Sequence, residues 1–130
     1  MIFLDTSAIY ALADETDKNH HSAINLLADI IDNGKQIILH NYILVEASAL
    51  LHKRLGKESA INFLEDSCAF DIIWIDSDLH KSAINEMKNS SSGVSFVDVL
   101  SFLVMERKKI TQYLGFDKHF ISAGFSVYQI

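Results

Sequence analysis

Short apolar runs alternate along this chain with longer stretches in which apolar side chains recur every three or four positions. Short runs that end on polar or small residues are typical of buried strands. Runs of this kind lie at residues 2–4, 36–40, 71–75 and 126–130. One more lies within the segment TQYLGFD and ends near Phe116. The helical spacing predicts helices at about residues 7–13, 21–33, 43–55, 58–67, 77–88 and 95–109.

The alternation of strands and helices predicts the fold class. A strand that follows a helix in this way favours a parallel sheet with helices on both faces, so we expect an α/β fold with three layers. The length is that of a single domain spanning residues 1–130. Ligands of such folds bind beyond the carboxyl ends of strands, where the strand order reverses. Asp5 and Asp117 each follow a predicted strand, and we expect them to converge.

Composition narrows the function classes. The net charge of −6, from 17 acidic and 11 basic residues, argues against a general electrostatic binder of nucleic acid. It leaves room for an enzyme that holds a metal in an acidic pocket. The single cysteine, Cys68, lies in an apolar segment, where we expect it to be buried, and it excludes a disulfide within the chain. No signal peptide or membrane span is evident, so we expect a cytoplasmic protein.

Four of the acidic residues lie in apolar surroundings, while the other thirteen lie in polar turns, at helix ends or on mixed helical faces. The four are Asp5, Glu46, Asp98 and Asp117. A lone buried carboxylate costs several kcal/mol, roughly, unless it is paired, hydrogen-bonded or bound to a metal. No basic residue lies one helical turn from Glu46 or Asp98. A divalent cation would compensate all four, and oxygen ligands favour Mg²⁺ or Mn²⁺.

Each acid also has a structural interpretation. Asp5 would cap the first helix, Asp117 would cap the turn after it, and hydroxyls or water would satisfy Glu46 and Asp98. The six histidines form no zinc-binding pattern, and we interpret them as structural. The joint occurrence of the four acids favours a site over four separate coincidences.

The segments FLDTSAI, NYILVEAS, SFVDVLS and GFDKHF carry these acids in this order. With this order, spacing and length, the chain resembles the PIN-domain family of metal-dependent ribonucleases, and most closely the VapC-like toxins of toxin–antitoxin pairs. The resemblance implies an α/β/α sandwich around a parallel sheet of about five strands. It also implies a nuclease domain that hydrolyses RNA with Mg²⁺ or Mn²⁺, forms a homodimer and is inhibited by an antitoxin.

The resemblance assigns roles to individual residues. Asp5, Glu46 and Asp98 match the three core acids of the family, and Asp117 matches the fourth. The small polar residues that match supporting positions are Thr6, Ser7 and Ser95. The chain departs from the family at Gly115, where members often carry a hydroxyl residue two positions before the fourth acid.

Basic residues near these segments are candidates for contacts with the RNA backbone: Lys53, Arg54 and Lys118. The basic run 107–109 is better explained as the charged end of a helix. A haloacid-dehalogenase phosphatase would need a second Asp where Ser7 stands, and a response-regulator receiver would need an acidic pair in its first turn. A catalytically silent PIN-fold module that binds RNA or protein is the remaining alternative, and the presence of all four acids argues against it.

Overall fold

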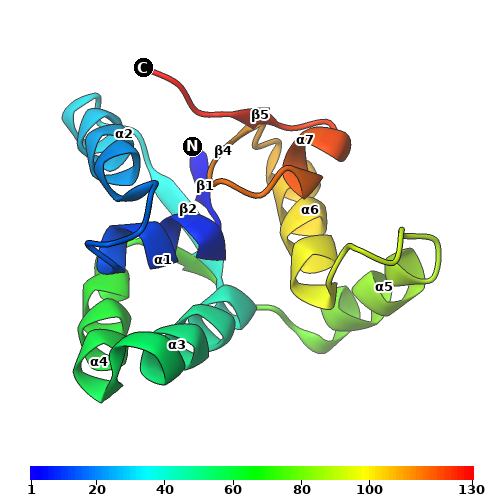
Figure 1. Ribbon diagram of the computed structural model, residues 1–130. Helices are drawn as coiled ribbons and strands as arrows, with labels where there is room; N and C mark the ends of the chain where they lie inside the picture. Colours follow the sequence, from blue (N-terminus) through cyan, green and yellow to red (C-terminus); the bar gives the residue numbers. More distant parts are fainter.

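The computed structural model describes residues 1–130 and is built around a five-stranded sheet (Figure 1). All neighbouring strands are parallel, in the order β3-β2-β1-β4-β5. The strands are β1 (Ile2–Leu4), β2 (Ile37–His40), β3 (Asp71–Ile73), β4 (Gln112–Leu114) and β5 (Ser126–Val127). The expected parallel sheet of about five strands is confirmed.

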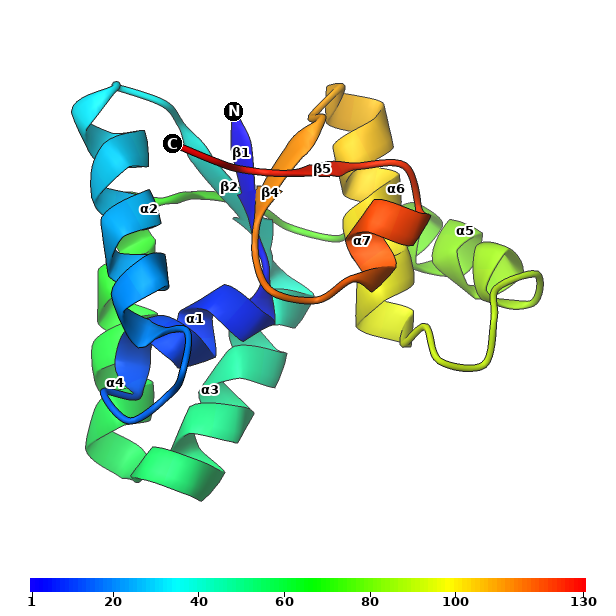
Figure 2. The same cartoon turned by 45° about the horizontal axis from the view of Figure 1, so that its top comes forward.

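Helices cover both faces of this sheet. They are α1 (Thr6–Ala13), α2 (His20–Asp32), α3 (Asn41–Leu55), α4 (Lys57–Asp66), α5 (Ser77–Met87), α6 (Phe96–Lys108) and α7 (His119–Ser122), with a 3-10 turn, η1 (Ser67–Ala69), after α4. Helices α1 to α4 lie on one face and α5 to α7 on the other, which makes the three expected layers (Figures 1 and 2). None of these helices has the length and apolar character needed to cross a membrane.

The central strand explains why the chain begins with an unbroken apolar run. All three residues of β1 are buried, because the strand has a neighbour on each edge and a helical layer on each face. Phe3 pairs with Ile38 of β2 on one side and with Tyr113 of β4 on the other. This register places the residue after β1 beside the residue after β4.

Three strands end earlier than the apolar pattern predicts, and beyond two of them a side chain accepts a backbone N–H. The Phe116 N–H donates to Ser7 Oγ at 2.8 Å, so β4 stops before it. The Ile75 N–H donates to Asn41 Oδ1 at 2.6 Å, which leaves that residue outside β3. At the sheet edge, β5 stops well short of residue 130.

The helix boundaries agree closely with the predicted ones. Asp76 caps α5, since its Oδ1 accepts from the Leu79 N–H at 2.8 Å. The short helix α7 was predicted only as a turn. The prediction that Cys68 is buried is wrong, because η1 runs along the surface and leaves the thiol exposed.

His40 links the sheet to helices of both layers through a fully buried side chain. Its Nδ1 accepts from the Ile43 N–H at 3.3 Å and so caps α3. Its Nε2 lies 2.9 Å from Ser101 Oγ, which in turn donates to the Val97 carbonyl on α6. Because Nδ1 accepts, Nε2 carries the proton and donates to Ser101. Burial of this neutral ring lowers the pKa of His40 to about 3.

We predict that His40 makes the fold sensitive to acid. Below the ordinary pKa of 6.5 the unfolded chain binds a proton at this residue and the folded chain does not, so stability falls as the pH falls. From this group alone the free energy of unfolding should drop by about 2 kcal/mol between pH 7 and pH 5. Urea unfolding at the two pH values should show this loss in the parent and not in His40→Gln. The exposed control His52→Gln should behave like the parent, and equal losses in all three proteins would contradict the prediction.

Candidate active site

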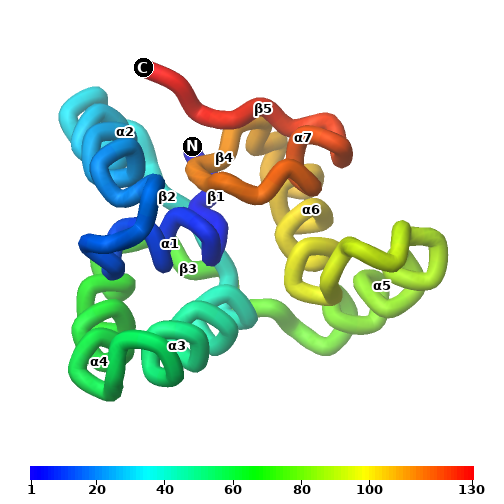
Figure 3. Tube along the Cα trace, in the orientation of Figure 1, coloured from blue at the N-terminus to red at the C-terminus, as the bar shows by residue number.

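The strand order reverses between β1 and β4, since the chain moves from β1 to one side of the sheet and later returns to the other side. Asp5 follows β1 directly, and Asp117 follows β4 after a two-residue turn. Figure 3 shows the chain leaving these two neighbouring strands side by side at the same edge of the sheet. The expected convergence of Asp5 and Asp117 at this edge is therefore confirmed.

Asp5 is both a helix cap and a member of an acidic cluster. Its Oδ2 accepts from the Ser7 N–H at 3.2 Å and from the Ser7 hydroxyl at 2.6 Å, which caps α1. The residue is only 5% exposed. Burial raises the pKa of Asp5 to about 6, opposed by the hydrogen bonds from Ser7 and assisted by the negative charges of Asp98 and Asp117. The helix cap predicted for Asp5 is confirmed, and its role as a metal ligand stays a prediction.

Asp98 has a local structural role at the start of α6. It is the third residue of α6, and it forms a capping box with Ser95. Asp98 N–H donates to Ser95 Oγ at 3.1 Å, and Ser95 N–H donates to Asp98 Oδ2 at 3.2 Å. Partial burial still raises the pKa of Asp98, and the charge of Asp117 adds to the rise. Capping accounts for the position of this acid but does not neutralise it.

Asp117 brings a histidine into the cluster. Its Oδ1 accepts from the His119 N–H at 2.9 Å, and its carbonyl accepts from the Tyr113 hydroxyl at 3.0 Å. The His119 ring places Nδ1 at 3.1 Å from Asp117 Oδ1 and 3.7 Å from Asp98 Oδ2. Possible ligand atoms of Asp98, Asp117 and His119 all lie within 4.8 Å of one another. His119 was not among the site residues predicted from the sequence, although its position two residues after the fourth acid was an available signal.

Glu46 stands apart from this cluster. It lies on α3, is half-buried, and makes no hydrogen bond or ion pair. It lines a shallow hollow together with Tyr42, Val45 and Val97. Val97 directly precedes Asp98, so the first turn of α6 contributes both to this hollow and to the acidic cluster. The structure thus brings Asp5, Asp98 and Asp117 together, with Glu46 at the margin.

The supporting hydroxyls have distinct positions. Ser7 Oγ donates to Asp5 and accepts from the Phe116 N–H, so it ties the end of β1 to the chain after β4. Ser95 positions Asp98 through the capping box. Thr6 Oγ1 is buried and has no hydrogen-bond partner.

Gly115 departs from the family pattern for a steric reason. A Cβ at this position would lie 2.9 Å from Asp5 Cβ, 3.1 Å from the Tyr113 ring and 3.2 Å from Ser7 Oγ. Any larger residue would force β1 and β4 apart at the point where Asp5 sits. In this chain the hydroxyl group beside Gly115 belongs to Ser7.

Of the basic residues predicted to contact RNA, only Lys118 lies at the acidic cluster, exposed between Asp117 and His119. Lys53 and Arg54 are in the last turn of α3, far from its start at the carboxyl edge. The Arg54 guanidinium lies 5.2 Å from the centre of the Tyr10 ring, a cation–π contact that links α3 to α1. The run 107–109 closes α6 at the end opposite Asp98.

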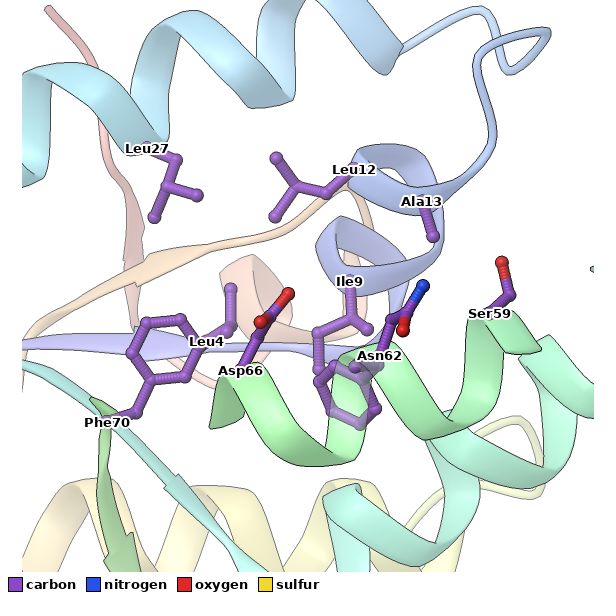
Figure 4. A pocket seen from close by; sticks show the side chains of 10 residues that line it. Leu4, Ile9, Leu12, Ala13, Leu27, Ser59, Asn62, Asp66 and Phe70 are labelled. Carbon is purple, nitrogen blue, oxygen red and sulfur yellow. The ribbon is translucent and has the colours of Figure 1, made fainter. Parts of the chain in front are cut away.

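A second pocket, of about 380 Å³, lies between α1, α2 and α4 (Figure 4). Its lining is mostly apolar, with Leu12 of α1 facing Leu27 of α2 and Ile9 of α1 pointing toward α4. None of the four candidate acids lines it. The pocket suits an apolar side chain and offers no cluster of charged groups for chemistry.

The fold and the acidic cluster agree with a known family. The PIN domain family matches residues 2–126, and the chain belongs to this family. It is similar to the 23S rRNA-specific endonuclease VapC20 of Mycobacterium tuberculosis, strains CDC 1551 / Oshkosh and ATCC 25618 / H37Rv. Each is 32% identical over 128 residues, which cover 96% of this chain and 95% of the relative. The crystal structure of M. tuberculosis VapC20, described as a sarcin–ricin loop cleaving toxin, matches with a TM-score of 0.83 and 30% identity over 96% of each chain.

We predict that Asp5 lowers the stability of the metal-free protein at neutral pH. The rise of its pKa from 3.8 to about 6 corresponds to at most about 3 kcal/mol against folding when the group is ionised. The folded chain holds this proton more tightly, so stability is lost as the pH rises through this range. Asp5→Asn should therefore raise the melting temperature at pH 7.5 in the presence of a chelator, with a smaller gain at pH 4.

Thermal denaturation followed by circular dichroism measures this effect. Asp32→Asn is the matched control, since Asp32 is exposed and its side chain makes no hydrogen bond. The control should melt with the parent at both pH values. A lower or unchanged melting temperature for Asp5→Asn at pH 7.5 would contradict the prediction.

Proposed function

We propose that this chain is a metal-dependent endoribonuclease that hydrolyses RNA phosphodiester bonds, with residues 1–130 forming one PIN-like nuclease domain. The observation that carries the proposal is the meeting of Asp5, Asp98 and Asp117 at the reversal point of the sheet. Burial raises the pKa of Asp5 and of Asp98 there, and acids with raised pKa values at such a place are typical of functional sites.

The donor set fits a divalent metal ion, Mg²⁺ or Mn²⁺. Carboxylate oxygens of Asp98 and Asp117 lie near each other, and their charges act on Asp5. The buried Nδ1 of His119 has no hydrogen-bond partner, as expected for a polar atom that faces a ligand. A bound divalent ion would activate water and stabilise charge on the phosphoryl oxygens.

Side chains of this protein would bind the ion, orient the attacking water and support the acids. Asp5, Asp98 and Asp117 would hold the ion, and Glu46 would contribute from the margin of the cluster. Asp98 or Asp117 would orient the attacking water and accept its proton. Thr6, Ser7 and Ser95 would support the acids, and Ser7 keeps Asp5 in place through its 2.6 Å hydrogen bond.

We propose RNA as the substrate, and the sarcin–ricin loop of 23S rRNA as the first target to test, because the related VapC20 carries this description. Lys118 is exposed beside the acidic cluster and would contact the RNA backbone. The net charge of −6 means that recognition would depend on the shape of the target more than on general charge attraction.

We further propose that the chain is a cytoplasmic VapBC-type toxin that forms a homodimer and is inhibited by an antitoxin. The apolar pocket between α1, α2 and α4 would accept apolar side chains of the antitoxin. Val45 and Trp74 are 68% and 71% exposed, respectively, and would supply apolar area to the dimer interface.

The nuclease proposal predicts that cleavage of a sarcin–ricin loop RNA needs a divalent ion and the acids. Asp98→Asn, Asp117→Asn and Glu46→Gln should each lower kcat/KM by at least ~100-fold, the scale on which loss of one electrostatic contact to the reacting atoms lowers kcat. Initial cleavage rates with Mn²⁺, with Mg²⁺ and with chelator measure this.

The exposed acids Asp32 and Glu65 supply matched controls, as Asp32→Asn and Glu65→Gln. Both should cleave like the parent. Parent protein without ion-dependent cleavage, or acid variants as active as the parent, would overturn the nuclease proposal and favour a silent binding module.

The toxin proposal predicts growth arrest on induced expression without an antitoxin. Arrest should require the nuclease, so Asp98→Asn expressed to the same level should leave growth unchanged. Growth curves and immunoblots of the two strains measure this. Normal growth with active parent protein would exclude the toxin role and leave the nuclease proposal intact.

A further inference from the structure

His119 is the one side chain of the acidic cluster that has a nitrogen donor and no place in the proposed mechanism. It belongs to the short helix α7 and reaches back across Asp117 toward Asp98 on α6. Its side chain is 43% exposed, yet its Nδ1 atom is buried on the side of the carboxylates. A solvated surface histidine would turn this nitrogen to water.

The contact of His119 with Asp117 is not an ordinary hydrogen bond. Nδ1 lies 3.1 Å from Asp117 Oδ1, within hydrogen-bonding distance, but it has no hydrogen-bond partner. The in-plane axis of the nitrogen therefore points past the oxygen. A histidine that served only to orient the carboxylate would aim its N–H at it.

The same geometry is that of neighbouring ligands on one metal ion. Two ligands at right angles, each about 2.1 Å from the ion, lie about 3 Å apart, and both point at the ion instead of at each other. The distances from His119 Nδ1, 3.1 Å to Asp117 and 3.7 Å to Asp98, fit this arrangement. An ion bound to the two carboxylates would meet the free nitrogen.

The opposite edge of the ring is held by the loop before α6. A Cβ on Gly93 would lie 3.4 Å from His119 Nε2 and 3.8 Å from Cε1, so the bare glycine backbone lets the ring lie against this loop. The ring thus has carboxylates at one edge and Gly93 at the other. This placement keeps Nδ1 directed at the cluster.

We propose that His119 Nδ1 is a ligand of the metal site, together with Asp98 and Asp117, and that it makes the site prefer Mn²⁺ to Mg²⁺. Mg²⁺ binds oxygen almost exclusively, while first-row transition ions accept imidazole nitrogen readily. A site made of oxygen donors alone would discriminate less. The inference rests on the proposed function, because it assumes that the cluster binds a divalent ion.

The experiment uses the full chain without a histidine tag, loaded with one equivalent of Mn²⁺. Pulsed electron paramagnetic resonance detects ¹⁴N coupling when an imidazole is bound to Mn²⁺, and calorimetry measures the affinities for Mn²⁺ and Mg²⁺ separately. The variant is His119→Ala, and the control is His52→Ala at an exposed histidine of α3.

The parent and His52→Ala should show ¹⁴N coupling and bind Mn²⁺ at least ~10-fold more tightly than Mg²⁺. His119→Ala should lose the coupling and lose ~10- to 100-fold in Mn²⁺ affinity, with a much smaller change for Mg²⁺. Mn²⁺ bound without ¹⁴N coupling in the parent would overturn this inference and leave the proposed nuclease intact. An unchanged Mn²⁺ preference in His119→Ala would also overturn it. No Mn²⁺ binding to the parent would overturn both proposals.

Discussion

The close approach of β1 and β4 at their carboxyl ends is the constraint on which the site depends. Ser7 Oγ donates to Asp5 and accepts from the Phe116 N–H, so one hydroxyl ends the β4 ladder and holds the first acid. Gly115 makes this possible, because a Cβ there would collide with Asp5. With the two strands held in this register, the turn after β4 carries Asp117 to the same edge.

The carboxylates of the site destabilise the folded protein when no cation is bound to them. Asp5 is buried, and its pKa is raised by desolvation and by two neighbouring negative charges. Local hydrogen bonds offset part of this cost: the Asp5 carboxylate accepts from Ser7, the Asp98 carboxylate from the Ser95 N–H, and the Asp117 carboxylate from the His119 N–H. These contacts fix the positions of the carboxylates without neutralising them. A bound cation would remove the repulsion that remains.

Local patterns predicted most of the fold and part of the site. The apolar run 2–4 predicted a buried central strand, and the regular apolar spacing placed helix ends close to the observed ones. The strand ends were predicted less well, because Ser7 and Asn41, both remote in sequence, capture the N–H groups of Phe116 and Ile75. These hydrogen bonds join residues far apart in the sequence, so no local pattern predicts them.

By itself, the sequence determined the parallel α/β architecture and the identity of the four acids, because hydrophobic periodicity and carboxylates in apolar segments are local properties. Only the tertiary structure decided which of these groups meet. It brought Asp5, Asp98 and Asp117 together, left Glu46 at the margin and added His119. The physical reason is that the distances between these side chains depend on strand order, register and helix packing, and these follow from burial of the whole core.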